Sequence, residues 1–377
     1  MKSLRRSPAA DPTEDDDLLW EILLRLPPQP SSLPRASLVC KRWRRLVSDS
    51  VFFRRFQLHH RRNPPLLGLF DRCQCLPFVP ALEAPNRVPP WRFSLQTEDD
   101  VGCPTSLGCR HGLVLLHLPK SLQVLVWDPF TGDQHRIALP PRFCAKGTMI
   151  NGAVLRTTGH VHFQVVLVTA DDGGSHRLAF ACVYSSHTGR WGDLVSTPIP
   201  SEPEVHLDFL SPTVVNPQAA VLVGNSLHWL LFGCNFAGIL DFDLDRHRLA
   251  VTQVPLDILA QGDDVAITRT EWGGLGFILL SDFSAHLWNR EHDCNGVASW
   301  VLRRTIDLDK LLSLNLEEER DPLTIIGFAE SSNVVLLWTG SLFMVQLESL
   351  QFKKLSETNM VACSPFESVY AASNSMP

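Results

Sequence analysis

The chain has 377 residues, of which 45% are hydrophobic and 20% are charged. This composition excludes a chain that is disordered throughout, and the length predicts a small domain joined to a larger one. The formal charge of −6 is unevenly distributed, because residues 1–62 carry 13 Lys/Arg and 7 Asp/Glu, whereas the remainder carries 21 and 33. The sequence therefore predicts a short basic module followed by a larger acidic one.

The N-terminal sequence MKSLRRSPAADPTEDDD contains charges but no apolar run, so we do not expect a signal peptide. The longest apolar runs, such as GLVLLHL and SLHWLLFG, are far shorter than the roughly 20 residues of a membrane helix, which predicts no membrane association. The ten cysteines have no regular spacing, and we expect buried free thiols. These features predict an intracellular protein, in the cytoplasm, the nucleus or both.

Residues 15–58 have the periodicity of short helices. One face of the first helix carries the apolar side chains of Leu18, Leu19, Ile22, Leu23 and Leu26. The acidic run 15–17 suits a helix start, and Pro27 ends the helix. A second helix is expected to begin near Ser31 or Ser32, where Pro34 is tolerated in the first turn.

A tryptophan surrounded by cationic side chains follows. The apolar residues of this stretch form one stripe at helical spacing: Val39, Trp43, Leu46 and Val47. The cationic residues Lys41, Arg42, Arg44 and Arg45 fall mostly off that stripe. We therefore expect the tryptophan in the core and the cationic side chains in solvent.

So small a helical unit buries little surface and needs a partner to cover it. The stretch DDLLWEILLRLPPQPSSLPRASLVCKRWRRLVSDSVFFRRF resembles the F-box, whose pattern is matched by Leu18-Leu19, Ile22-Leu23, Leu26-Pro27, Leu33, Arg35 and Val39-Cys40-Lys41-Arg42-Trp43-Arg44. F-boxes commonly open with Leu-Pro, a piece that inserts into the adaptor, and here Glu14 and Asp15 stand in those places.

The resemblance implies binding to a Skp-type adaptor and, through it, to a cullin–RING ubiquitin ligase of the SCF type. The residues that it assigns to adaptor binding are Leu18, Leu19, Ile22, Leu23, Leu26, Pro27, Leu33, Val39, Cys40 and Trp43.

From about residue 64 the helical period gives way to short runs of Val, Leu, Phe and Trp between turn residues, which indicates an all-β domain. The clearest unit has a strand that ends at Trp127, followed by the turn sequence Asp128-Pro129-Phe130-Thr131-Gly132. Further strand pairs are expected around Trp229 and Phe242, Ile278 and Trp288, and Leu336 and Val345. The tryptophans at these strand ends, with Trp338, are expected in the core of their sheets.

The strand-and-turn landmarks near Asp128, Ser185, Asp243, Asn289 and Glu348 recur every 45–60 residues or so, a period typical of four-stranded propeller blades. With a strand over 66–70, they predict six blades. We expect this strand to lie beside residues 364–370, because a closed ring leaves few unpaired sheet edges.

The segments CRHGLVLL, VWDPFTG, VLVGNSLHWLL and GFAESSNVVLLWT look like the F-box-associated β-propeller of large plant F-box families. The predicted fold is therefore a small all-α F-box module followed by an all-β propeller. The expected boundaries are a disordered N-terminus over 1–14, the F-box over 15–58, a linker over 59–65, the propeller over 66–372 and a disordered tail over 373–377.

Three short motifs could carry chemistry, and each has a simpler interpretation. Asp171-Asp172-Gly173-Gly174 lacks the further oxygen ligands of a calcium loop and is typical of a hairpin turn. The acidic run 317–321 is typical of a solvated loop. The stretch from Cys109 to Gly112 places a possible nucleophile near a possible base, His111, but near neighbours along a strand rarely form a working pair. We expect no catalytic residue, cofactor or metal.

Three functions remain open. The first is a substrate receptor that holds an unknown protein near a ubiquitin-loaded enzyme. The second is a propeller enzyme such as a glycosidase, which needs two carboxylates converging in the channel. The third is a nucleic-acid binder that uses the arginines of residues 35–62, although the −12 remainder opposes it.

Overall fold

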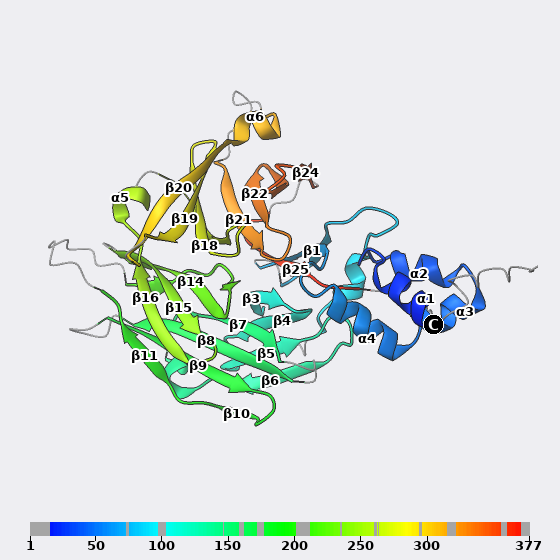
Figure 1. Cartoon of the computed structure of the whole chain (residues 1–377). Coiled ribbons are helices and arrows are strands. Elements are labelled where there is room, and N and C mark those ends of the chain that lie inside the picture. Colours follow the sequence, from blue (N-terminus) through cyan, green and yellow to red (C-terminus); the bar gives the residue numbers. More distant parts are fainter. Residues whose placement is uncertain are drawn as a thin grey trace, which may run out of the picture.

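The computed structural model describes residues 16–72, 75–96, 103–145, 147–157, 162–171, 177–200, 212–233, 236–259, 262, 264–293, 296–314, 322–355 and 360–370. A helical module lies at one side of a six-bladed β-propeller (Figure 1). The predicted fold is confirmed. Four predicted segments lie outside the described residues. They are the disordered ends over 1–14 and 373–377, the hairpin tip at 172–174 and the acidic run at 317–321.

The helical module consists of four helices: α1 (Asp16–Leu24), α2 (Ser32–Ser37), α3 (Lys41–Val47) and α4 (Ser50–His59). Asp49 caps α4 by accepting hydrogen bonds from the backbone N–H groups of Val51 and Phe52. The prediction that Val39 begins the apolar stripe of this helix is wrong. Cys40 is extended and α3 begins only at Lys41, so Val39 lies outside the helix and 62% of it is exposed.

The core of the module is formed by all four helices, with Leu46 and Val47 from α3 and aromatic residues from α4. Leu19, Leu23 and Phe52 are fully buried, and Phe52 contacts the edge of Trp20 at a ring distance of 5.5 Å. Trp43 is half-buried against the same core, as expected. The core also includes Val369, which follows the last strand of the propeller.

Each blade is an antiparallel sheet. Blade 1 contains β3 (Thr105–Arg110), β4 (Leu113–Leu118), β5 (Gln123–Trp127) and β6 (Gln134–Ala138). Blade 2 contains β7 (Ile150–Arg156), β8 (Phe163–Asp171), β9 (Leu178–Ser185), β10 (Arg190–Trp191) and β11 (Val195–Pro198). Blade 3 contains β12 (Val214–Val215), β13 (Val221–Val223), β14 (Ser226–Gly233), β15 (Phe236–Asp243) and β16 (Arg248–Gln253).

Blade 4 contains β17 (Asp264–Arg269), β18 (Leu275–Ser281), β19 (Ser284–His292) and β20 (Ala298–Asp307). Blade 5 contains β21 (Thr324–Ala329), β22 (Val334–Thr339), β23 (Ser341–Gln346) and β24 (Phe352–Lys354). Blade 6 contains β2 (Phe78–Pro80), β1 (Leu66–Asp71) and β25 (Cys363–Glu367). Short helices α5 (Leu256–Leu259), α6 (Leu308–Leu312), η2 (Pro90–Phe93) and η3 (Pro141–Cys144) occupy connections.

Blade 6 closes the ring by joining the two ends of the propeller sequence. β1 pairs antiparallel with β25, and the register places Leu69 opposite Pro365 and Phe70 opposite Ser364. Phe366 is fully buried and contacts Phe70 at a ring distance of 5.4 Å. The predicted proximity of residues 66–70 and 364–370 is confirmed.

The turn and strand pairs read from the sequence are also confirmed. Asp128 accepts hydrogen bonds from the N–H groups of Phe130 and Thr131, and Gly132 has a positive φ of 82°. The three expected strand pairs are β14 with β15, β18 with β19, and β22 with β23. Trp127 and Trp229 are buried, whereas Trp288 and Trp338 are half-buried against hydrophobic clusters.

Polar side chains connect neighbouring blades around the channel. Asn151 of blade 2 donates to the carbonyl groups of Asn216 and Gln218 in blade 3, at 2.7 Å each. The Ser106 hydroxyl of blade 1 lies 2.8 Å from that of Ser364 in blade 6. Since these groups are buried, their hydrogen bonds also fix the spacing between the inner strands.

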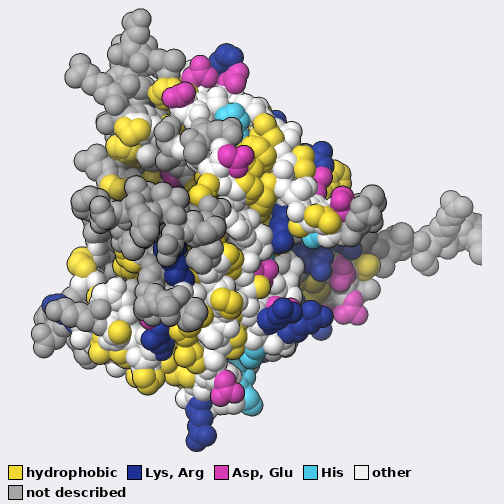
Figure 2. Space-filling model, turned by 90° about the vertical axis from the view of Figure 1, so that its left-hand side faces the viewer, with side chains coloured by type: hydrophobic (Ala, Val, Ile, Leu, Met, Phe, Trp, Pro, Cys, Tyr) yellow, Lys and Arg dark blue, Asp and Glu magenta, His cyan; other side chains and the backbone are white. Residues whose placement is uncertain are grey.

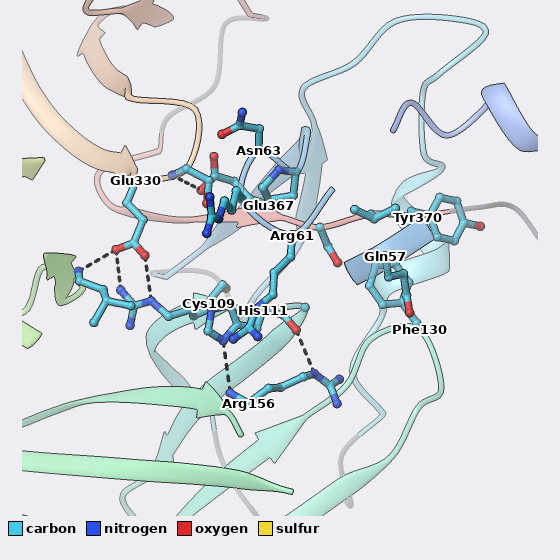
Figure 3. A pocket seen from close by; sticks show the side chains of 18 of the residues that line it. Gln57, Arg61, Asn63, Cys109, His111, Phe130, Arg156, Glu330, Glu367 and Tyr370 are labelled. Atoms are coloured by element: carbon cyan, nitrogen blue, oxygen red, sulfur yellow. Dashed lines mark hydrogen bonds and ion pairs between the residues drawn. The ribbon is translucent and has the colours of Figure 1, made fainter. Parts of the chain in front are cut away.

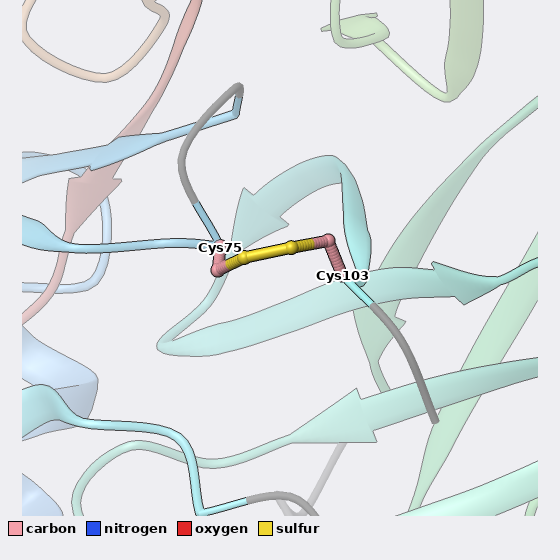
Figure 4. Close-up of a disulfide and its surroundings, with 2 residues drawn as sticks. All are labelled: Cys75 and Cys103. Atoms are coloured by element: carbon pink, nitrogen blue, oxygen red, sulfur yellow. A yellow bond between two sulfur atoms is a disulfide. The ribbon is translucent and has the colours of Figure 1, made fainter. Parts of the chain in front are cut away.

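Among the described cysteines, the prediction of buried free thiols is confirmed for Cys182 and Cys363, Cys109 and Cys144 are only partly buried, and the prediction is wrong for three others. Cys75 and Cys103 form a disulfide between the β1–β2 connection and the segment before β3 (Figure 4). They are 28 residues apart in sequence, and the ring brings their Cα atoms to 5.0 Å. Cys40 is free but exposed. Only the fold reveals such a pairing, because irregular spacing does not specify partners.

Closure by β25 predicts that deleting residues 360–377 destabilises the propeller. Met360, Phe366 and Val369 are buried apolar side chains, and their loss removes about 1.5–3 kcal/mol each. We expect the free energy of unfolding, measured by chemical denaturation, to fall by about 5 kcal/mol or more. Deletion of residues 371–377 is the control and should change it little. Equal stability of the two truncated chains would contradict closure by β25.

Candidate functional site

The first helix presents apolar side chains to solvent beside its buried face. Leu18 and Ile22 lie one helical turn apart and are 49% and 42% exposed, while Leu19 and Leu23 are fully buried. An exposed apolar pair of this kind is unfavourable in water and is typical of a surface that a partner covers.

A second apolar group lies at the corner between α2 and α3. Leu38 and Val39 are 73% and 62% exposed. The ion pair between Arg42 of α3 and Asp16 of α1, at 2.7 Å, brings this corner near the start of α1. Leu18, Ile22, Leu38 and Val39 are called the exposed apolar face below.

The residues predicted to bind the adaptor fall into three groups. The exposed ones are Leu18, Ile22, Pro27, Val39 and Cys40; the half-buried ones are Leu26 and Trp43; and the buried ones are Leu19, Leu23 and Leu33. The buried group supports the helices and is not available to a partner. Leu38 was not among the residues predicted to bind the adaptor. Its position directly before Val39, which was among them, is the signal in the sequence that could have identified it.

A large cavity lies where the helical module meets the propeller. Its volume is about 1250 Å³, and its walls come from strand ends and turns of all six blades, from α4 and from residues 61–64 (Figure 3). It opens at the end of the channel on the side of α4, and it is called the channel mouth below.

Two ion pairs fix arginines in the channel mouth. Arg110 donates two hydrogen bonds to the carboxylate of Glu330, at 2.9 and 2.6 Å, and a third to the carbonyl group of Ala220. Arg156 contacts Asp128 at 2.5 Å, and its guanidinium also donates to the carbonyl group of His111. Arg156 therefore connects the neighbouring blades 1 and 2, whereas Arg110 of blade 1 reaches across the channel to blades 3 and 5. Both arginines have little freedom to move.

Glu367 lies at the end of β25 and accepts hydrogen bonds from the backbone N–H groups of Ser331 and Ser332, at 2.9 and 2.8 Å. Burial raises the pKa of Glu367 above its usual value, and the two serine N–H groups partly oppose this shift. The carboxyl group thus joins blade 6 to the turn between β21 and β22.

The thiol and imidazole noted in the sequence do lie in the channel mouth, but they do not form a nucleophile and base pair. Burial strongly raises the pKa of Cys109, which therefore stays a thiol. His111 uses Nδ1 to accept a hydrogen bond from the backbone N–H of Arg156. No group of three metal-ligating side chains occurs within the part of the chain that the structure describes.

The side of the molecule away from the helical module has a mixed surface. Figure 2 shows hydrophobic side chains scattered among acidic and basic ones on this side. Among the described residues, no helix has the length and apolar character that crossing a bilayer requires.

The helical module, its exposed apolar face and the attached propeller define an F-box protein with a propeller domain. Residues 15–55 match the F-box domain, and residues 106–370 match the family described as "F-box protein AT5G49610-like, beta-propeller". Because the second match covers more than half of the sequence, the chain belongs to this family.

No curated protein matches the chain. Among solved structures, the chain is similar to the Dos1 propeller, with 10% identity, coverage of 69% of this chain and 66% of that chain, and a TM-score of 0.36. It is also similar to Kuenenia stuttgartiensis hydrazine synthase (7% identity, 67% and 81% coverage, TM-score 0.32) and to a luciferin-regenerating enzyme (12%, 82% and 96%, TM-score 0.35). Such low TM-scores carry no information about function.

Burial of Glu367 predicts a pH dependence of stability. Its pKa in the folded chain lies above the usual value of 4.5, so the protonated form is favoured by folding. The stability that this group contributes is fully present below the usual pKa of 4.5 and is lost as pH rises through the raised pKa of the folded chain. Chemical denaturation between acidic and neutral pH should therefore show wild type losing stability relative to Glu367→Gln.

The matched control is Glu348→Gln, which removes an exposed carboxylate from the same channel mouth. The inferred effect of burial would be contradicted if the free energy of unfolding of wild type, minus that of Glu367→Gln, stayed constant or increased as pH rises.

Proposed function

We propose that the chain is the substrate receptor of an SCF-type cullin–RING ubiquitin ligase. Its F-box docks on a Skp-type adaptor, and its propeller captures a substrate protein. The observation that carries this proposal is the exposed apolar face, which belongs to an F-box that is fixed to the propeller.

The adaptor covers the exposed apolar face. Leu18 and Ile22 project from a helix whose other face is anchored by Leu19 and Leu23, so their positions are set before binding. Pre-set apolar side chains gain from burial without a large loss of freedom. The N-terminal acidic residue Asp16 is paired with Arg42 and adds a polar edge to this surface.

The junction between the two domains supports a proximity mechanism. The backbone N–H of Ser31 donates to Asn86 of the propeller at 3.1 Å, and Val369 packs in the F-box core. A substrate on the propeller is thereby held at a defined distance from the adaptor and the ubiquitin-loaded enzyme. No chemistry by the chain itself is needed, and we propose a non-enzymatic role in the cytoplasm, the nucleus or both.

Exposed tryptophans are candidate substrate contacts on the propeller. Trp272 and Trp91 are 91% and 75% exposed. Their sequence neighbours Glu271 and Arg92 line the channel mouth, so both tryptophans lie near its rim. Tryptophan is enriched among the residues that dominate protein–protein binding.

The other two functions have less support. Three of the five described carboxylates of the channel mouth are engaged, which is unlike a glycosidase pair. Asp128 and Glu330 are held in ion pairs with arginines, and Glu367 accepts two backbone hydrogen bonds. Within the basic stretch of residues 35–62, Arg42 is paired with an acid, and the excess of acidic residues in the propeller opposes nucleic-acid binding.

Changing Leu18 and Ile22 together to Asp should abolish adaptor binding. Charge placed in a buried apolar interface costs about 3 kcal/mol or more, which weakens affinity roughly 100-fold or more. Isothermal titration of the full-length chain with a recombinant Skp-type adaptor measures this effect.

The matched control is the double change of Val51 and Leu58 to Asp, because these residues of α4 are 51% and 48% exposed. Both double variants should unfold at temperatures close to that of wild type, since the altered residues are exposed. Undiminished adaptor binding by the Leu18 and Ile22 variant would refute the proposed docking face.

A further inference from the structure

The channel mouth contains an excess of arginine. Seven arginines and five acidic residues line it among the residues that the structure describes, and no lysine does. Two of the acids, Glu330 and Asp128, are paired with Arg110 and Arg156. A third, Glu367, is hydrogen-bonded to backbone N–H groups.

Five arginines are left without a carboxylate partner among the described residues: Arg54, Arg61, Arg62, Arg92 and Arg269. The first three belong to α4 and the segment that follows it, whereas Arg92 and Arg269 belong to the propeller. Arg61 is half-buried and points into the cavity, toward the strand end that carries Cys109 and His111 (Figure 3). Cationic groups from both domains thus line one cavity, which they share with the two remaining carboxylates, Glu271 and Glu348.

Like charges gathered around a cavity repel one another, and a bound anion removes that repulsion. The planar guanidinium group of arginine matches phosphate because it donates two parallel hydrogen bonds. The volume of about 1250 Å³ is far more than a single phosphate fills, and it exceeds the usual range for drug-sized ligands. Arg110 and Arg156, which are already fixed, give the cavity a rigid base.

We propose that the channel mouth binds a small molecule that carries several phosphate groups and bridges the F-box and the propeller. Arg61 and Arg62 contact the ligand from the F-box side, and Arg269 contacts it from the propeller side. A ligand held from both sides binds the docked arrangement of the domains more tightly than any other. Binding therefore stabilises the docked orientation of the F-box and the propeller.

The test uses the full-length chain and isothermal titration at constant ionic strength. Inositol hexakisphosphate, ATP and inorganic phosphate are the probes, and they distinguish a cyclitol polyphosphate from a nucleotide and from a single phosphate. We expect one of the two polyphosphates to bind with one-to-one stoichiometry and a Kd below about 100 µM. That probe should also raise the unfolding temperature, whereas inorganic phosphate should bind more weakly.

Two variants and one control locate the site. Arg61→Gln with Arg62→Gln should raise Kd by about tenfold or more, and Arg269→Gln by about threefold or more, because each removes charge-assisted hydrogen bonds. The control is Arg246→Gln with Arg248→Gln, which removes two exposed arginines at the β15–β16 hairpin, outside the cavity. Its Kd should stay within about twofold of wild type.

The proposal is overturned if neither polyphosphate binds, or if the control weakens binding as much as the cavity variants do. Each cavity variant is first shown to unfold at the same temperature as wild type without ligand. A variant that fails this check is replaced by Arg54→Gln, which changes an exposed side chain of α4 in the same cavity. Adaptor affinity is measured separately, so failure here leaves the receptor assignment standing.

Discussion

The pairing of β1 with β25 is the interaction on which the rest of the molecule depends. It joins the first and last strands of the propeller into blade 6 and brings Phe70 and Phe366 together in one aromatic cluster. Without it, blades 5 and 1 would each expose an unpartnered face, and the stacking of six similar sheets could not be completed. The buried Ser106–Ser364 contact then sets how closely these inner strands approach.

The same strand also connects the propeller to the F-box. Directly after β25, the backbone N–H of Ser368 donates to the carbonyl group of Pro65, Val369 enters the F-box core, and Tyr370 stacks on Phe130. A helical module this small gains stability from such packing. The C-terminal segment therefore closes the ring, contributes to the domain junction and lines part of the channel mouth, which helps the F-box and the propeller to act as one unit.

Much of this architecture could be predicted from the sequence, because it depends on local patterns. Helical spacing identified the apolar face of the first helix, although not which of its residues are buried (Leu19 and Leu23) and which are exposed (Leu18 and Ile22). The turn chemistry of Asp128 located a blade hairpin. The exposure of Val39 could not be predicted, since it depends on α3 starting only after an extended Cys40. Nor could the channel mouth, because its arginines come from segments as distant as Arg61 and Arg269 and only the closed ring brings them together.

The central claim is that a protein captured by the propeller is brought to the ubiquitin ligase because the F-box of the same chain docks on the adaptor. The most direct measurement is the half-life of proteins that co-purify with the chain, in cells that produce either wild type or the Leu18→Asp, Ile22→Asp variant. The account predicts that both forms capture the same proteins, and that only wild type shortens their half-lives in a proteasome-dependent manner. Captured proteins whose half-lives are the same with either form would contradict it.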